Sequence, residues 1–288
     1  MAAVDVFKYR TSSPADTSPL SRLEKEGYSA ADVVAVVGKT EGNGCVNDFS
    51  RTLSSHVWES KIPSSAVTVF SGGTEGVLSP HVTFLVRSKQ RTGLVACSGQ
   101  TRDFASQEIG TETQGREIAA TISEMLNKAG IQKEAVHLVL IKCPLLTSTD
   151  IEQIRAAGQT PITTDTYSSM ALSRYASAIG IALALDEISA EKVSTALESG
   201  HEAVWSSRAS CSSGAELQNC HIMILAADPQ EQQGQLRAIS GHMEDAMDAR
   251  VLLEMLDQIK AENGKVVQVF VKAEADPILD MLGQQLEG

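Results

Sequence analysis

The sequence predicts an α/β protein built from repeated units around a pseudo-threefold axis, with the third unit incomplete. Apolar runs of strand length alternate with stretches of helical periodicity, which is typical of this class. A β-branched run that ends in lysine occurs three times, and a Ser-Gly turn followed by a further apolar run occurs twice. Repetition on this scale indicates a repeated structural unit.

The lysine-ended runs are ADVVAVVGK, AVHLVLIK and KVVQVFVK, which end at Lys39, Lys142 and Lys272. Their β-branched content predicts three buried strands. The two turn segments, residues 71–86 and 212–225, align when one loop residue is dropped. In both, a serine begins the turn, a glutamate follows four residues later, and a histidine opens the next strand.

Helical periodicity predicts three long helices. Residues 112–129 place their apolar side chains on one face, and Gly130 is a suitable C-cap. Residues 168–186 are mostly small and apolar and form a second helix. Residues 243–260 form a third, amphipathic helix.

Two polar segments, 87–110 and 227–235, are expected to be linkers. They divide the chain into a first α/β unit (1–90), a second α/β unit (106–228) and a partial third unit (236–288). The third unit has a helix and a lysine-ended run, but no Ser-Gly turn follows it.

Composition excludes several classes of function. The 288-residue chain has a net charge of −12 and no cluster of Lys or Arg, so neither nucleic acid nor an anionic membrane is an expected partner. No apolar run is long enough for a membrane helix. Five cysteines without a C-x-x-C pair indicate a reduced cytoplasmic protein. The six histidines show no ligand spacing, so no local pattern argues for a metal site.

The strand-end lysines and the serine turns together suggest a nucleophile and its base. Burial disfavours an ammonium group, so it lowers the pKa of a strand-end lysine. A neutral amine can then take a serine proton, and a neighbouring backbone N–H can stabilise an oxyanion. Such a pair would attack an amide or imide carbonyl. The alternative is that these lysines are solvated strand ends and the Ser-Gly segments are ordinary turns.

Two arginines fit the same interpretation. Arg51 follows the glycine-containing loop after Lys39, and Arg174 lies within the predicted helix of small, apolar residues at 168–186. A guanidinium can hold the carbonyl oxygens of a flat ring in its plane. The alternative for each arginine is a surface salt bridge.

Six stretches resemble the cyanuric acid amidohydrolase/barbiturase family of ring-opening amidohydrolases. They are GKTEGNGCVNDFSR (38–51), FSGGTEGVLSPH (70–81), IKCPLLT (141–147), SRYASAIGIALAL (173–185), ASCSSGAEL (209–217) and VKAEAD (271–276). The resemblance implies three α/β units around one central site. It assigns to that site Lys39, Arg51, Ser71 and Gly72 from the first unit, Lys142, Arg174, Ser212 and the Ser213 backbone from the second, and Lys272 from the third.

The resemblance also implies a reaction. Ser212 would be the nucleophile and Lys142 its base, in a Ser-Lys dyad that needs no cofactor, and the protein would be a homotetramer. Cyanuric acid would yield biuret and CO₂, and barbituric acid, the alternative substrate, would yield ureidomalonate. The residues alone leave open whether Ser71 or Ser212 reacts, and Ser210 and Ser213 lie close to Ser212.

The motifs end at Asp276, so the chain is expected to be C-terminally truncated relative to the family. The family's third Ser and Arg, and its C-terminal divalent metal site, would then be absent. Whether residues 277–288 are native stays open. An inactive, ligand-binding pseudoenzyme or an unstable fragment is therefore an alternative to an active hydrolase.

Overall fold

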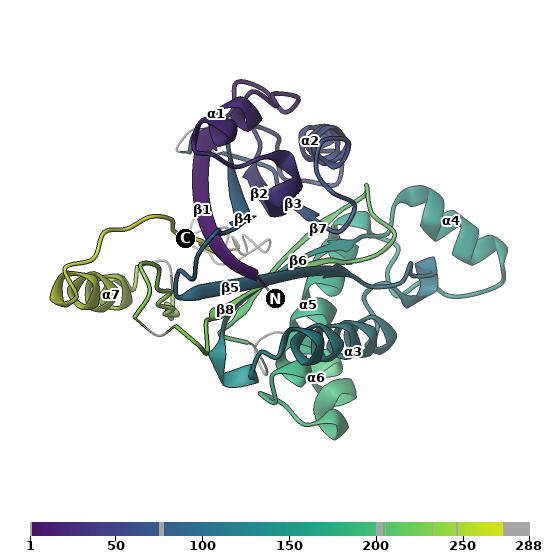
Figure 1. The fold of residues 1–288 in the computed structure, drawn as a ribbon. Helices are drawn as coiled ribbons and strands as arrows, with labels where there is room; N and C mark the ends of the chain where they lie inside the picture. The colour runs from purple at the N-terminus through teal and green to yellow at the C-terminus, as the bar shows by residue number, and fades with distance from the viewer. Residues whose placement is uncertain are drawn as a thin grey trace, which may run out of the picture. The chain divides into compact units, whose positions relative to one another are not determined.

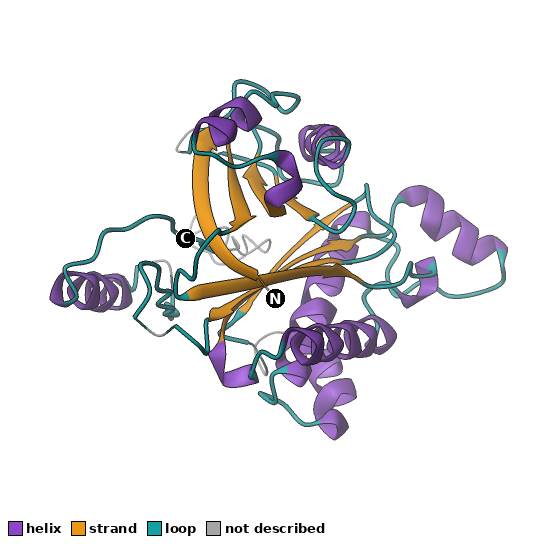
Figure 2. Ribbon diagram, in the orientation of Figure 1, coloured by secondary structure: helices purple, strands orange, loops and turns teal. Residues whose placement is uncertain are grey.

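The computed structural model describes residues 2–74, 78–199, 204, 206–231, 233–245 and 247–272. The chain forms two compact units, Met1–Ser240 and Gly241–Gly288. Figures 1 and 2 show their strands and helices. In chain order the elements are β1 (Ala2–Arg10), α1 (Pro19–Lys25), β2 (Val33–Lys39), α2 (Phe49–Glu59), β3 (Val67–Ser71), β4 (His81–Arg87), β5 (Leu94–Gln100), α3 (Glu112–Ala129), β6 (Val136–Pro144), α4 (Ser148–Ala156), α5 (Thr166–Ala184), α6 (Val193–Ser199), β7 (Ala209–Gly214), β8 (His221–Ala227) and α7 (Ala249–Ala261).

The two halves of the sheet in the first unit have the same strand order when each is followed inward from its edge. The strand order of the whole sheet is β3-β2-β4-β1-β5-β8-β6-β7. In each half the second strand pairs in parallel with the third and antiparallel with the fourth. The halves meet through two antiparallel residue pairs between β1 and β5. This unit therefore contains two copies of one four-stranded motif, which confirms the predicted α/β class with repeated units.

Helices α3 and α5 cover one face of the second motif (Figure 1). The alternation of side chains along a strand explains the arrangement, because every second residue points to the helices. Val139 and Ile141 of β6 and Ile222 and Ile224 of β8 lie in this core with the helices. Burial of apolar surface stabilises this layer by about 25 cal/mol for each Å² that is removed from water. Lys142 lies on the opposite face of β6.

The first motif repeats this arrangement with different helices. Trp58 of α2 packs edge-on against Phe84 of β4, with ring centroids 5.3 Å apart. Phe70 of β3 and Val36 of β2 belong to the same core. By strand alternation, Lys39 lies on the other face of the motif.

The faces that carry the lysines meet. Strand β3 of the first motif contacts β6, β7 and β8 of the second. Lys142 Nζ donates a hydrogen bond to the Phe70 carbonyl oxygen (2.8 Å), and His221 Nδ1 lies 3.2 Å from the Thr68 carbonyl oxygen. The two motifs thus place their lysine-bearing faces against each other.

The predicted helices agree with the structure to within a few residues at most ends. Helix α3 spans 112–129 as predicted and ends at Gly130, which has a left-handed φ of 65°. Helices α5 (Thr166–Ala184) and α7 (Ala249–Ala261) correspond to the predicted helices at 168–186 and 243–260. No helix in the described part of the chain is long and apolar enough to span a bilayer.

One strand prediction and one linker prediction need correction. The segment 265–272, KVVQVFVK, forms no strand, and Val266, Val267, Val269 and Val271 are more than half exposed. A strand requires a hydrogen-bonded neighbour, and no described residue provides one here. The predicted linker 87–110 contains β5, which joins the two motifs. The unit limits predicted at residues 90, 106, 228 and 236 stay predictions.

Candidate active site

A histidine, a lysine and a serine lie side by side across β8, β6 and β7. Lys142 is paired with His221 on one side and with Ser212 on the other. Directly paired residues point to the same face of a sheet. The first motif has the same row, in which Lys39 is paired with His81 and Ser71. The repeated pattern in the sequence therefore corresponds to one spatial arrangement that occurs twice.

Each lysine binds the residue that follows its serine. Lys39 Nζ donates to the Gly72 carbonyl oxygen at 2.9 Å, and Lys142 Nζ donates to the Ser213 carbonyl oxygen at 2.8 Å. Lys142 has a further acceptor in the Phe70 carbonyl oxygen at 2.8 Å. These bonds hold each amine at the start of the serine turn.

Lys142 is almost completely buried, with 1% of its surface exposed. Burial lowers its pKa to about 8, because the charged form loses its hydration. The carboxylate of Glu216, whose Oε1 lies 3.5 Å from Nζ, opposes this shift, and the positive charge of Arg51 reinforces it. Lys142 therefore loses its proton far more readily than an exposed lysine.

Ser212 lies on the same face as Lys142, while its neighbour does not. Ser212 Oγ is 3.5 Å from the Ile141 carbonyl oxygen, which is a long and weak hydrogen bond. Ser213 Oγ is buried without a hydrogen-bond partner among the described residues. Strand alternation puts the Ser213 side chain on the helix side of the sheet with Cys211, which belongs to the helix-covered core. Ser210 shares the face of Ser212, two residues away.

His221 completes the row, and its buried imidazole favours the neutral form. Burial lowers its pKa, and the charge of Lys142 acts in the same direction. The hydrogen bond to Thr68 and the charges of Glu59 and Glu216 partly offset this. A neutral imidazole next to Lys142 adds no second positive charge to the row.

Arg51 and Asp48 organise the glycine loop of the first motif. Arg51 is 3% exposed and donates to the carbonyl oxygens of Gly44 (3.1 Å) and Cys45 (2.6 Å). Asp48 caps α2 by accepting from the Ser50 N–H at 3.0 Å, and it also accepts from the Gly44 N–H at 2.9 Å. The loop and the arginine are thus held together.

Gly72 has a steric role in this loop. A Cβ atom at Gly72 would lie 1.6 Å from Asp48 Oδ2 and 3.1 Å from Gly44 N. Only the absence of a side chain lets the Asp48 carboxylate approach the serine turn so closely. The predicted site residue Gly72 therefore lies directly against Asp48 and Gly44, in the loop that precedes the helix of Arg51.

The remaining predicted residues are placed differently. Arg174 lies half-buried on α5, and its positive charge lowers the pKa of the Cys143 thiol, which burial raises. It therefore lies close to the residue that follows Lys142. Lys272 is exposed in the second compact unit, Gly241–Gly288, and its role in the site stays a prediction.

Two carboxylates of this region were missed by the sequence interpretation. Glu216 pairs with Lys142, and Asp48 holds the glycine loop before α2 by accepting from the Gly44 N–H. The repeated pattern of a glutamate four residues after each serine was a signal for Glu216. Its counterpart Glu75 lies outside the described residues. The signal for Asp48 was its position as an N-cap before the helix that carries Arg51.

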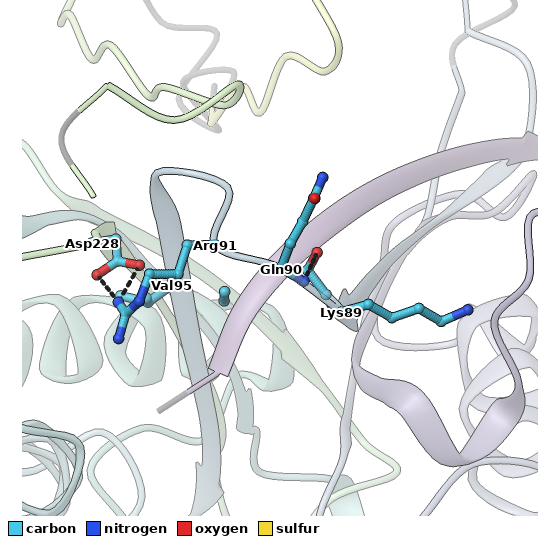
Figure 3. Close-up of a pocket in the computed structure, with 7 residues that line it drawn as sticks. Lys89, Gln90, Arg91, Val95 and Asp228 are labelled. Atoms are coloured by element: carbon cyan, nitrogen blue, oxygen red, sulfur yellow. Dashed lines mark hydrogen bonds and ion pairs between the residues drawn. The ribbon is translucent and has the colours of Figure 1, made fainter. Parts of the chain in front are cut away.

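A pocket of about 270 Å³ lies elsewhere, beside Arg91 (Figure 3). The Asp228 carboxylate points at the Arg91 guanidinium, and the two form a pair of hydrogen bonds of 2.7 and 2.8 Å. Asp228 is fully buried, and these bonds, together with one from the Gln230 N–H, satisfy its carboxylate. None of the predicted site residues lines this pocket.

Residues 5–286 match the family model described as amidohydrolase ring-opening protein. The match runs past Asp276, so the prediction that the resemblance ends there is wrong. Residues 277–288 lie outside the described part of the chain.

The chain is similar to proteins named cyanuric acid amidohydrolase. It is 56% identical over 279 residues to one from Sarocladium sp, covering 96% of this chain and 81% of that protein. It is 51% identical over 289 residues to one from Pseudonocardia dioxanivorans, covering 99% of this chain and 83% of that protein.

A solved structure described as "Cyanuric acid hydrolase: evolutionary innovation by structural concatenation" superposes with a TM-score of 0.86 at 38% identity, covering 96% of this chain and 82% of that one. The crystal structure of the A. caulinodans hydrolase superposes with a TM-score of 0.79 at 36% identity, covering 90% and 76%. The family model, the sequence identities and the fold agree, and the chain belongs to the amidohydrolase ring-opening protein family.

Proposed function

We propose that this protein is a hydrolase that opens the ring of cyanuric acid and yields biuret and CO₂, with Ser212 as nucleophile and Lys142 as base. The observation that carries the proposal is the pairing of Ser212 with the buried Lys142 on one face of the sheet. The choice of cyanuric acid as substrate rests on the relatives that are named cyanuric acid amidohydrolase.

The chemistry follows from the lowered pKa of Lys142. The neutral amine takes the Ser212 hydroxyl proton while Oγ bonds to a ring carbonyl carbon. When the tetrahedral intermediate collapses, the ring C–N bond breaks and the Lys142 ammonium gives its proton to the leaving nitrogen. Lys142 then takes a proton from a water molecule that attacks the carbamate ester of Ser212, and its ammonium gives that proton to Ser212 Oγ as the serine leaves. The carboxybiuret product loses CO₂ and becomes biuret.

The other predicted residues would bind the ring. Cyanuric acid presents three carbonyl oxygens in one plane, which suits hydrogen-bond donors arranged around it. The N–H of a residue next to the nucleophile suits the developing oxyanion. The proposed binding residues are Lys39, Arg51, Ser71, Gly72, Arg174, Ser213 and Lys272.

Hydrolysis of cyanuric acid by the purified chain tests the proposal, with barbituric acid as the parallel substrate. We expect consumption of cyanuric acid with formation of biuret, and loss of both in Ser212→Ala. Faster turnover of barbituric acid would make the protein a barbiturase. A folded chain that binds cyanuric acid without turnover would instead be a pseudoenzyme.

Three further expectations accompany the proposal. Every proposed step uses a group of this chain or water, so treatment with EDTA is expected to leave turnover unchanged. The family resemblance implies a homotetramer, which light scattering on the purified protein measures. The cysteine content favours a cytoplasmic location, which fractionation of the source cells tests.

A further inference from the structure

Glu216 is a buried carboxylate that the proposed mechanism does not use. Its side chain is 6% exposed, and Oε1 lies 3.5 Å from Lys142 Nζ. Neither oxygen has a hydrogen-bond partner among the described residues. A buried carboxylate without such partners is costly unless a positive charge faces it. Lys142 provides that charge.

The chain leaves room for this carboxylate. A Cβ atom at Gly214 would lie 2.1 Å from Glu216 Oε2 and 2.4 Å from Oε1. Even alanine at position 214 would displace the carboxylate. The turn after Ser212 therefore both supplies the carboxylate and leaves open the space that it occupies.

The charged and titratable groups that act on Lys142 come from several elements. Glu216 and Cys143 raise its pKa, and Arg51 of the first motif lowers it. His221 of β8 faces Lys142 as its paired residue. Glu216 is the partner in direct ionic contact with the amine. The other acceptors of Nζ are neutral carbonyl oxygens, which cannot take a proton at ordinary pH.

We propose that Glu216 is a positioning residue that holds the Lys142 amine next to Ser212 and governs the loss of its proton. This inference rests on the proposed function. In the resting pair the ammonium faces the carboxylate. The carboxylate stabilises the ammonium form, so the amine must lose this proton to solvent before it can act as a base. The amine lone pair can then accept the Ser212 proton.

The pH profile of kcat/KM for Glu216→Gln and Glu216→Asp tests the proposal. Glutamine keeps the shape but removes the negative charge, so Lys142 holds its proton less tightly. We expect the acidic limb of Glu216→Gln to move to lower pH by about one unit or more, and its plateau to fall at least about tenfold. Glu216→Asp keeps the charge, and its limb should stay near that of the wild type. A Glu216→Gln limb that stays in place or moves to higher pH overturns the proposal.

A second measurement needs no turnover. NMR of protein labelled with ¹³C and ¹⁵N in lysine follows the titration of Lys142 Nζ directly, and Lys142→Met identifies its signal. We expect a lower Lys142 pKa in Glu216→Gln than in the wild type, and an equal or higher pKa contradicts the proposal. If the wild type fails to hydrolyse cyanuric acid, the proposed function fails, while this titration still decides whether Glu216 controls the Lys142 proton.

Thermal unfolding covers the case in which a single variant folds poorly. Lys142→Met leaves Glu216 buried without its cation, and Glu216→Gln removes that charge again. We expect the double variant to have a higher Tm than Lys142→Met alone. A double variant with a lower Tm than Lys142→Met would show that the two side chains do not act as a pair.

Discussion

Lys142 Nζ lies 2.8 Å from the carbonyl oxygen of Phe70, and this hydrogen bond joins the two repeated motifs. Phe70 precedes Ser71 on β3, whereas Lys142 ends the apolar part of β6. The proposed base of the second motif is therefore held by the strand that carries the serine of the first. Both motifs thus contribute to the surroundings of the Lys142 amine.

Ser212→Ala is expected to abolish turnover, and Ser71→Ala to weaken it. Loss of the nucleophile removes the covalent step, so kcat/KM should fall by at least about 10³-fold. Loss of a ring-binding hydroxyl should cost about 10- to 100-fold. Steady-state kinetics measures both, and mass spectrometry of quenched reactions locates the acyl group. Ser210→Ala and Ser213→Ala are the controls. An acyl group found on Ser210 or Ser213 of the wild type would contradict the choice of Ser212.

The rate should rise with pH through the ionisation of Lys142. Burial lowers the pKa of this lysine to about 8, and the base must be neutral to accept the serine proton. We therefore expect kcat/KM to increase as the pH rises toward and through about 8, and then to level off. A profile that is flat across this range would exclude Lys142 as the titrating base.

Arg51→Met should shift the Lys142 pKa upward. The positive charge of Arg51 acts to lower that pKa, so its removal makes the ammonium easier to keep. The direction is opposite to that expected for Glu216→Gln, and the same NMR titration measures both. Arg155→Met is the control, because Arg155 is exposed on α4. A fall in the Lys142 pKa of Arg51→Met would contradict the electrostatic assignment.

Stability should also depend on pH through Lys142. Its folded-state pKa of about 8 is below the ordinary lysine value of 10.5. Between these two values the unfolded chain binds more protons than the folded chain, so the free energy of unfolding rises with pH. Lys142→Met lacks this contribution. Urea unfolding across the window should show a rise in the wild type that is smaller in the variant.

Gly72→Ala should destabilise the glycine loop. Its Cβ would overlap the Asp48 carboxylate, which caps α2 and holds the Gly44 N–H. We expect a loss of at least about 2 kcal/mol in unfolding free energy. Asp48→Ala alone should cost about 1 kcal/mol through the lost cap. If the overlap is the cause, Gly72→Ala costs much less in an Asp48→Ala background, and additive costs would contradict it.

The sequence predicted the row of residues better than it predicted the sheet. Lys39 and Lys142, with Ser71 and Ser212, were recognisable because strand period and turn chemistry are local signals. Strand β5 was mistaken for a linker because residues 87–110 are mostly polar, and its pairing with β1 and β8 depends on distant residues. The valine-rich run that ends at Lys272 was predicted as a strand for the opposite reason, since local propensity cannot supply a neighbouring strand.

The charge partners of the site could not be derived from local pattern. Glu216 was visible as part of a repeat, but its ion pair with Lys142 depends on how β6 and β7 align. The role of the Phe70 carbonyl oxygen could not be predicted, because every residue has a main-chain carbonyl and the residue type does not show which one accepts a hydrogen bond from Lys142. The influence of Arg51 on Lys142 likewise depends on the meeting of two motifs that are far apart in the chain.

The acceptor that Phe70 offers to Lys142 belongs to the polypeptide backbone, so no amino-acid replacement can delete it. Saturation mutagenesis at position 70 would report only the demands of the phenyl ring, which packs so closely on Gly38 that a Cβ there would lie 2.1 Å from it. This contact between the motifs is thus hidden from genetic screens and constrains natural variation only through backbone geometry. Semisynthesis that replaces the amide bond after Phe70 with an ester would weaken that carbonyl as an acceptor and reveal its contribution.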